Sequence, residues 1–373
     1  MLSPQRHAIT VTGPVPADQL GVVMMHEHVL HDDVEEPSLM EPLPGSAGER
    51  LRDAPMSMEL LGTLWRWPLA NRENTRLTER DGIADELARY RLAGGTTVVE
   101  ASTVGFHPDP AGLRRIAEAS GIQIVSGCGY FVGSVLPEGF DDRSTEELAS
   151  ELIRDIRVGM GDTGVKAGLI GEVGTSPQLT AREAKSLRAS GIAAAETGAC
   201  VSVHLSFTVS PHTEAGNASE AAFQAIEILG SEGVPAGRVV CCHLDEAQNV
   251  ELALRLIDRG CVVGYDTFGT EWYWDHWKTW EPHDSHRVFE VAQLCRRGHH
   301  QSIVLSQDVA FKRHLHRFGG LGYDHLLTSI VPMLLDAGVT REQLEQMLVA
   351  TPRRLLTFPG SAEDDVTPEP RRG

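Results

Sequence analysis

Two histidines separated by one residue end an apolar run near the start of the chain. Residues 21–28 read GVVMMHEH, and the apolar first part of this run is typical of a buried strand. Side chains alternate faces along a strand, so His26 and His28 are expected on one face and Glu27 on the other. A single buried histidine is more often structural than a ligand, so the pair needs further residues to indicate chemistry.

Four more residues of metal-binding type fall at the ends of other apolar runs. They are Glu172, His204, His243 and Asp308. Taken singly, each has a structural interpretation, because a histidine can bond to backbone and a carboxylate can cap a helix. The carboxyl ends of parallel strands meet at one rim of a barrel, where barrel enzymes place their chemistry. Four imidazoles and two carboxylates exceed what one tetrahedral zinc needs, so the pattern favours two metals bridged by Glu172 and a hydroxide.

The elements that must position these residues are short strands alternating with amphipathic helices. Strands are expected at 21–28, 96–102, 122–128, 167–173, 200–206, 238–243, 261–267 and 302–308. Helices are expected at 110–120, 181–197, 217–232 and 247–259, and capping boxes at Ser144 with Glu147, Thr180 with Glu183 and Thr340 with Gln343. This alternation implies βα units and a parallel sheet. Eight units predict an α/β fold, a (β/α)8 TIM barrel with long βα loops at its carboxyl-terminal rim. An open doubly wound sheet is disfavoured because no G-x-G-x-x-G follows an early strand.

The domain organisation follows from where the regular spacing breaks. Residues 1–358 are expected to form a single metal-binding barrel domain, with loop insertions at 30–75 and 268–288. Residues 359–373 are rich in Pro, Asp and Arg and are expected to be a disordered tail.

Composition limits the class of partner. The 373 residues carry a formal net charge of -19, which argues against nucleic acid or an anionic membrane surface as a partner. No apolar run approaches the length of a membrane span, and no secretory signal opens the chain, so a cytoplasmic protein is expected. The six cysteines form no C-x-x-C pair and are interpreted as buried free thiols.

Motifs along the chain resemble those of the phosphotriesterase family of the amidohydrolase superfamily. The resemblance runs from TVTGPVPADQLGVVMMHEHV to ATPRRLLTF, which is nearly the whole chain. Between these ends it includes AGLIGEVGTS, VHLSF, CCHLDE, LSQD and GGLGYDHLL. Together these motifs are far more specific than a lone H-x-H.

The resemblance implies a role for each candidate ligand. His26 and His28 would bind the more buried metal ion together with Asp308, and His204 and His243 would bind the more exposed one.

The resemblance also implies what bridges the two ions. Some members of the family use a carboxylated lysine and others a glutamate. Here Gly171 stands at the lysine position and Glu172 follows it, so this chain looks like the glutamate-bridged branch. The cofactors expected are two divalent ions, Zn2+ first, with Mn2+, Co2+ or Fe2+ as alternatives.

The expected reaction is metal-dependent hydrolysis. The bridging hydroxide would attack a carbonyl or phosphoryl centre, and Asp308 is the expected catalytic residue that takes up the attacking proton. Glu27 is expected to give structural support. Asp245 and Glu246 either support the site or lie in a solvated turn.

Five residues outside the ligand set are candidates for substrate binding. Trp272 and Trp274 could cover an apolar part of a ligand, or pack a lid or a homodimer contact. Lys312 and Arg313 could bind an anionic group or form a surface salt-bridge patch, and Asp266 could orient a donor group.

These candidates favour a small-molecule substrate: a small ester, lactone or amide with an acidic end. The alternatives are a phosphoester or phosphotriester hydrolase, a single-metal enzyme of the wider superfamily, and a non-catalytic barrel that binds a hydrophobic ligand.

Overall fold

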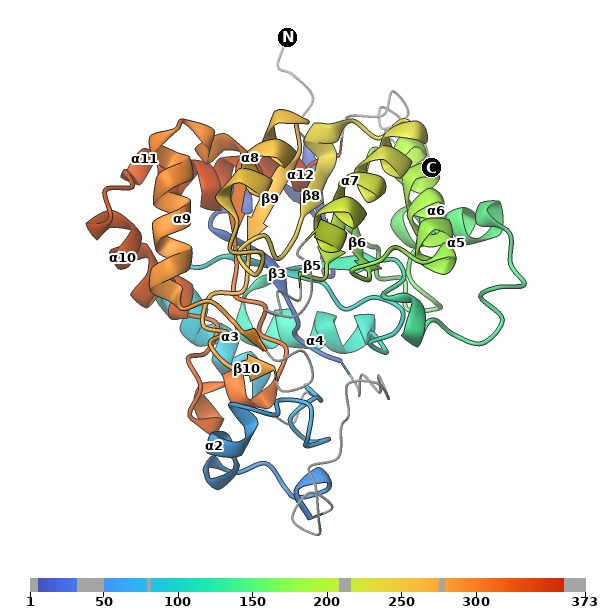
Figure 1. The fold of residues 1–373 in the computed structure, drawn as a ribbon. Helices are drawn as coiled ribbons and strands as arrows, with labels where there is room; N and C mark the ends of the chain where they lie inside the picture. Colours follow the sequence, from blue (N-terminus) through green and yellow to red (C-terminus); the bar gives the residue numbers. More distant parts are fainter. Residues whose placement is uncertain (1–5, 32–49, 79–81, 208–215, 275–278, 359–373) are drawn as a thin grey trace, which may run out of the picture.

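A parallel sheet of eight strands organises the computed structural model, which describes residues 6–31, 50–78, 82–207, 216–274 and 279–358. The strands, each hydrogen-bonded to the next, are β3 (Val23–Glu27), β4 (Thr97–Glu100), β5 (Gln123–Cys128), β6 (Leu169–Thr175), β7 (Val201–Leu205), β8 (Val239–Cys241), β9 (Val262–Tyr265) and β12 (Ile303–Leu305). Beyond β12, Asp308 N donates to His26 O and His28 N donates to Val309 O, both at 3.2 Å. The first and last strands therefore meet, and the predicted (β/α)8 barrel is confirmed (Figure 1).

Helices cover the outside of the barrel between successive strands (Figure 1). They are α3 (Ile83–Leu92), α4 (Pro110–Ser120), α5 (Thr145–Arg157), α6 (Ala181–Thr197), α7 (Gly216–Ser231), α8 (Val250–Asp258), α9 (Asp284–Arg296), α10 (Val331–Asp336), α11 (Arg341–Glu345) and α12 (Thr351–Leu356). The three predicted capping boxes are confirmed at the starts of α5, α6 and α11. None of the helices in the described ranges is long and apolar enough to cross a membrane.

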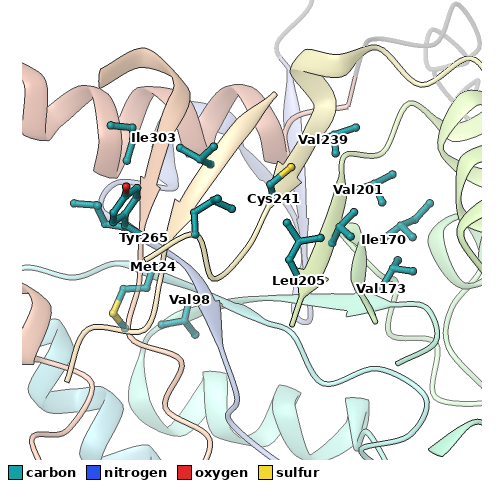
Figure 2. Close-up of a cluster of buried hydrophobic side chains, with 14 of the residues drawn as sticks. Met24, Val98, Ile170, Val173, Val201, Leu205, Val239, Cys241, Tyr265 and Ile303 are labelled. Carbon is teal, nitrogen blue, oxygen red and sulfur yellow. The ribbon is translucent and has the colours of Figure 1, made fainter. Parts of the chain in front are cut away.

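The hydrophobic core has two layers separated by the sheet. The outer layer packs strand residues such as Met24, Val98 and Ile170 among other buried apolar side chains (Figure 2). The inner layer fills the barrel with residues that include Met25 and Val99 from the strands and Cys200 just before β7. Adjacent cysteines 241 and 242 belong to different layers, as alternation predicts. All six cysteines are buried and free.

A short hairpin closes the amino-terminal end of the barrel. Strands β1 (His7–Thr10) and β2 (Gly13–Pro16) pair antiparallel, and Ala8 also bridges Thr357 at the end of α12. Ala8, Leu355 and Leu356 are fully buried and join the inner layer. This hairpin is not among the predicted elements, and its strands are only four residues long.

The two predicted insertions meet at the opposite end. The described part of the first contains α2 (Leu61–Leu64), and the second contains the hairpin β10 (Tyr273–Trp274) and β11 (Thr279–Trp280). Tyr273 N donates to Trp65 O at 2.9 Å, which joins them, and α2 and β10 lie near each other in Figure 1. Residues 32–49 and 275–278 of these insertions, and the predicted tail 359–373, lie outside the described residues.

Candidate metal centre

Two β-bulges bring candidate ligands to the inner face of the barrel. In β3, Met24 pairs with Val98 and Glu27 pairs with Glu100, so Met25 and His26 together oppose one residue of β4. Strict alternation would place Met24 on the face of His26, but the bulge shifts the register. Met24 packs outward and Met25 inward.

A second β-bulge lies in β6. Ile170 pairs with Val201 and Val173 with Val203, so Gly171 and Glu172 together oppose a single residue of β7. A bulge inserts one residue without changing the faces of the flanking positions. Glu172 can therefore enter the site while its apolar neighbours keep packing outward.

Left-handed backbone positions two further candidates. His243 follows Cys242, an inward-facing residue, yet its side chain also enters the site, and its φ is 62°. Asp308 lies three residues beyond the end of β12 with a φ of 53°. Such conformations cost a non-glycine residue about 1–3 kcal/mol and gather at functional sites. The fold holds both residues there through contacts made elsewhere.

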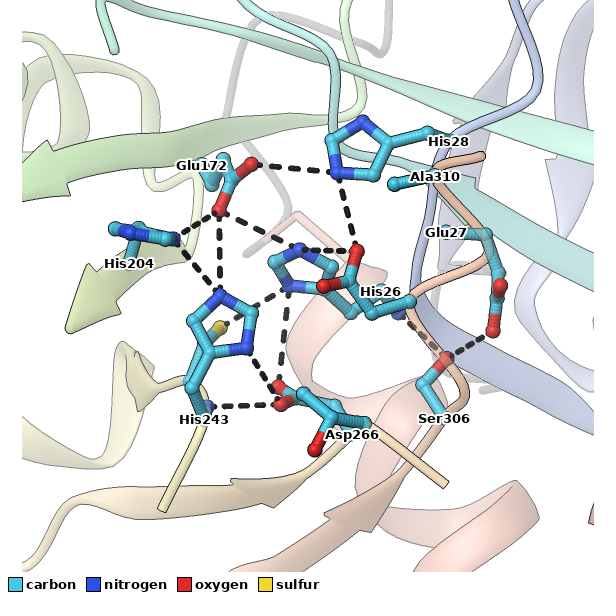
Figure 3. A network of polar contacts seen from close by, with 12 residues as sticks. His26, Glu27, His28, Glu172, His204, His243, Asp266, Ser306 and Ala310 are labelled. Atoms are coloured by element: carbon cyan, nitrogen blue, oxygen red, sulfur yellow. Dashed lines mark hydrogen bonds and ion pairs between the residues drawn. The ribbon is translucent and has the colours of Figure 1, made fainter. Parts of the chain in front are cut away.

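All six predicted ligands converge around Glu172 (Figure 3). Its Oε2 lies 3.0 Å from His204 Nδ1, 3.4 Å from His26 Nε2 and 3.6 Å from His243 Nε2. Its Oε1 lies 3.4 Å from His28 Nε2.

Asp308 completes the cluster on the side of His26 and His28. Its Oδ1 lies 3.2 Å from His28 Nε2 and 3.8 Å from His26 Nε2. Glu172 is shared by two groups of three whose ligand atoms lie within 4.8 Å of one another: His26, His28 and Glu172, and Glu172, His204 and His243. One carboxylate with a histidine pair on each side is an arrangement that suits two cations.

Three of the imidazoles turn their second nitrogen to a polar partner behind them. His28 Nδ1 lies 2.8 Å from Ser102 Oγ, and His243 Nδ1 lies 3.0 Å from Asp266 Oδ1. His26 Nδ1 lies 3.4 Å from Cys242 Sγ. Such partners fix the tautomer and leave Nε2 facing the centre. Ser102 and Cys242 were not predicted, because neither residue type marks this role in a sequence.

The donor set fits divalent metal ions. His26 Nε2 and Asp308 Oδ1 are buried and have no hydrogen-bond partner among the described residues. Burial opposes ionisation of Glu172, but His26 and His204 outweigh it and hold the pKa of this carboxyl well below its usual range. Burial lowers the pKa of His26, which favours the neutral imidazole that binds a metal. Buried anionic oxygens beside unpaired imidazole nitrogens require positive charge.

Outward-facing carboxylates brace the ends of the strands. Glu27 is fully buried; its Oε1 accepts from Ser306 Oγ at 2.7 Å and Gln307 N at 2.9 Å, and its Oε2 accepts from Val309 N at 2.9 Å. Burial raises the pKa of Glu27 to about 8. Glu100 accepts from Ser102 N at 3.0 Å in the same manner. Glu27 therefore supports the segment that holds Asp308, as predicted.

An aromatic cavity opens over the centre. It has a volume of about 200 Å³, and His28, Glu172, His204, His243 and Asp308 line its base. Its walls include the aromatic residues Phe106, Phe131, Phe207, Trp272, Trp274 and Phe311. Both predicted tryptophans thus reach the cavity, and Trp272 is almost fully buried.

The other predicted substrate-binding residues lie outside the described lining of this cavity. Asp266 lies behind His243, where its Oδ1 also accepts the backbone N–H of that residue at 2.8 Å. Lys312 Nζ lies 2.7 Å from Glu73 Oε2, and the Arg313 guanidinium packs between the rings of Trp65 and Trp272. The structure therefore brings none of these three residues into contact with the cavity.

Asp245 and Glu246, left open by the sequence, differ in their surroundings. Asp245 is fully buried, and its Oδ2 accepts from Arg287 Nε at 2.9 Å. Glu246 is partly exposed and lines the cavity, as does Glu281. Asp245 therefore supports the site from a buried position and Glu246 lines the cavity, so these residues do not form a solvated turn.

Comparison with known proteins gives consistent similarities. The family model described as "Phosphotriesterase family" matches residues 7–356. N-acetyltaurine hydrolase of Salmo salar is 34% identical over 354 residues, covering 94% of this chain and 97% of that protein.

Solved structures agree. A resiniferatoxin-binding protein from Rhodobacter sphaeroides superposes with a TM-score of 0.88 at 30% identity, covering 96% of this chain and 99% of that one. A phosphotriesterase homology protein from Escherichia coli, complexed with phosphate in its active site, gives a TM-score of 0.73 at 26% identity, with 91% and 99% covered.

Proposed function

We propose that this chain, which belongs to the phosphotriesterase family and is a hydrolase of that kind, cleaves a small ester, lactone or amide at a centre of two divalent metal ions. The observation that supports two ions is the position of Glu172, whose two oxygens face different histidines. A single-metal enzyme would not need a carboxylate placed between two histidine pairs.

The six ligands divide between the two ions. His26, His28 and Asp308 would hold one ion, His204 and His243 the other, and Glu172 both. Zinc suits imidazole and carboxylate donors, and manganese, cobalt or iron would also be accepted. Bound there, the ions would lower the pKa of water and polarise the oxygen of the substrate.

Asp308 is the residue we assign to proton transfer. It lines the cavity as well as contacting His28, so its carboxylate can accept the proton of the attacking water and deliver it to the leaving group. Burial opposes ionisation of Asp308, but the close contact with His28 and the neighbouring imidazoles outweigh it and lower its pKa. The carboxylate is therefore ionised before reaction.

The cavity supports a neutral or apolar substrate portion rather than an acidic end. The titratable side chains of its upper wall that the structure describes include Glu246 and Glu281, and no described lining residue is Lys or Arg. The acidic end expected from Lys312 and Arg313 therefore loses its basis, because neither residue belongs to the described lining of this cavity. A phosphoester is the second candidate, since one structural relative holds phosphate in its active site.

A hydrolysis screen with metal analysis tests this proposal. The zinc- or manganese-loaded protein is assayed on lactones, esters, N-acyl amines and phosphoesters, and its metal content is measured. We expect two ions per chain and turnover of at least one carbonyl class. Inactivity on all four classes with both ions bound would contradict the proposal.

One variant separates a hydrolase from a binding protein, the alternative that the resiniferatoxin-binding relative keeps open. Asp308→Asn removes the proton acceptor but leaves the cavity walls intact, so turnover should fall by about 10²-fold or more while an apolar ligand still binds. Equal turnover by the variant and the natural protein would exclude the role given to Asp308.

A cytoplasmic location, a homodimer and a small-molecule substrate, without nucleic-acid or membrane partners, stay predictions. Light scattering on the purified chain tests the homodimer directly.

A further inference from the structure

A second cavity lies beside the metal cavity. It has a volume of about 230 Å³, far more than the ~10–15 Å³ that a single water needs, and its lining includes Arg313, His314 and the glycine-rich segment 319–322. Trp272 lines the metal cavity, yet its ring stacks on His314 at 5.0 Å and lies 4.5 Å from Arg313 Cζ. One indole therefore contacts the walls of both cavities.

Arg313 is a buried cation without an anionic partner. Its side chain is held between Trp65 and Trp272, and its Nη1 donates to Leu64 O. The residue is only 7% exposed, but among the described residues no carboxylate forms an ion pair with it. Burial lowers the pKa of Arg313 to about 10, so the guanidinium is still charged at neutral pH.

The contrast with Arg287 shows what is missing. Arg287 is fully buried too, but it contacts Asp245 at 2.9 Å and Asp284 at 3.2 Å. A buried charge is ordinarily paired in this way. Arg313 lines a cavity and forms no ion pair with a carboxylate among the described residues.

His314, the next residue in the chain, lines the same cavity. Its Nδ1 accepts from Ala310 N at 3.0 Å and from Phe311 N at 3.3 Å, so Nε2 carries the hydrogen. This Nε2 is buried and has no hydrogen-bond partner in the part of the chain that the structure describes. Burial, helped by the charge of Arg313, lowers the pKa of His314 to about 3, so the ring is a neutral donor.

The rest of the lining is compatible with an anion. Glu271 is the one carboxylate in the described lining, and its Oε1 and Oε2 are taken up by Asp284 N at 2.8 Å and His283 Nδ1 at 3.0 Å. The glycine-rich segment packs closely on the chain that carries Arg313, because a Cβ at Gly320 would lie 2.2 Å from Arg313 O. Arg313 thus borders a cavity whose one described carboxylate already has partners.

We propose that this second cavity binds a small oxyanion (a carboxylate, sulfate or phosphate) through Arg313, and that its occupancy alters the metal cavity through Trp272. The planar fork of an arginine matches the oxygens of such anions. The proposal does not depend on the reaction catalysed at the metal centre. Coupling between the sites is reciprocal, so a ligand in the metal cavity would change the anion affinity by the same factor.

Anion titration of the metal-loaded full chain tests the proposal. Sulfate, phosphate and acetate are added at constant ionic strength, with chloride as the reference, and binding is followed by calorimetry and tryptophan fluorescence. All six tryptophans lie at positions 65, 67, 272, 274, 277 and 280, so the fluorescence reports on these loops. We expect a saturable response to at least one oxyanion and none to chloride. An equal response to all salts would mean ionic screening and would overturn the proposal.

Matched variants locate the site. Arg313→Gln should weaken oxyanion binding at least about tenfold, since it removes the charged donor. Lys312→Gln removes the same charge one residue away, from a side chain paired with Glu73 and outside the described lining of the cavity, and should bind as the natural protein does. Binding unchanged in Arg313→Gln would place the anion elsewhere, including at the metals, and refute the site.

A further variant keeps the test decisive if Arg313→Gln does not fold. Arg313→Lys retains the charge but loses the fork, and we expect weakened oxyanion binding with a normal circular dichroism spectrum. Full affinity in Arg313→Lys together with a loss in Lys312→Gln would reverse the assignment and contradict the proposal.

Discussion

Replacing Arg287 by Met should destabilise the protein more than any exposed arginine can. Arg287 lies at the start of α9, fully buried, and its Nε is 2.9 Å from Asp245 Oδ2. Its Nη2 donates to Thr267 Oγ1 and Thr270 O, both at 2.8 Å, and its Nη1 to Asp284 Oδ1 at 3.2 Å. One side chain thereby ties the ends of β8 and β9 to the segment that carries the tryptophans.

The magnitude follows from what the substitution leaves behind. Methionine has a similar length but no donor, so the buried carboxylates of Asp245 and Asp284 lose their cation. Breaking a buried pair from one side costs about 3–5 kcal/mol. The total stability of a typical domain is about 5–15 kcal/mol, so this loss is a large fraction of it.

Urea unfolding followed by circular dichroism measures the effect, and Arg157→Met is the matched control. Arg157 pairs with Glu196 at 2.7 Å, but both side chains are about half exposed, and such pairs contribute about 1 kcal/mol or less. The double variant Arg287→Met with Asp245→Asn should recover part of the loss, because the stranded charge is removed. If Arg287→Met and Arg157→Met cost the same within about 0.5 kcal/mol, the reasoning is refuted.

Four further outcomes are expected. Burial raises the pKa of Asp155 to about 7, so the folded chain keeps a proton that the unfolded chain releases near pH ~4, and stability falls as the pH rises between these values. Asp155→Asn should therefore be more stable than the natural protein at pH 8, by about 1–2 kcal/mol after allowing for solvent, and equally stable near pH 4; thermal melts at both pH values check this. Thr180→Ala removes the capping box of α6 and should cost about 1 kcal/mol in urea unfolding, whereas Thr180→Ser should restore most of it. Gly127→Ala places a Cβ 1.7 Å from the backbone oxygen of Gly171, so it should cost at least about 3 kcal/mol, and a natural Tm would contradict the packing. Chelation of the metal-loaded protein should lower its Tm and added zinc should restore it, since an ion at 100 times its Kd adds about 2.7 kcal/mol.

The barrel could be predicted because its signals are local and repeated. Every expected strand is present within three residues of its expected ends, and α4 and α6 occupy the expected ranges. Every βα unit repeats an apolar run, and α4, α5, α6 and α8 also have capped starts, so an error in one unit would not change the fold class. The hairpin of β1 and β2 was not predicted, because it is buried only against the amino-terminal end of the assembled barrel. Local sequence patterns carry no information about that contact.

The ligand set could be predicted because barrel topology turns six separate strand ends into neighbours. How the side chains reach the centre could not be predicted. His26 and Glu172 depend on bulges, and His243 and Asp308 on left-handed backbone, neither of which has a local sequence signal here. For Asp266 the predicted position at a strand end is correct, but the predicted contact with substrate is not supported. Its side chain lies behind His243 and contacts the Nδ1 of that residue.

The roles of Lys312 and Arg313 show the limit of sequence patterns in loops. Two adjacent cations after a strand end suggested a single anionic subsite. The two side chains instead go to unrelated partners, a carboxylate in one case and two indole rings in the other. Those partners belong to the first insertion and the tryptophan segment. These two loops are far apart in the sequence and meet only in the folded protein, so local patterns cannot indicate the contacts.

The plugged floor of the barrel has a kinetic consequence. The hairpin, α12 and the inner apolar layer fill the amino-terminal end of the barrel, and the described lining of the cavity over the ligands comes from the opposite end. In the reaction proposed above, substrate would enter and products would leave on the side of the βα loops. The rate of turnover would then depend on the conformation of these loops as well as on bond cleavage.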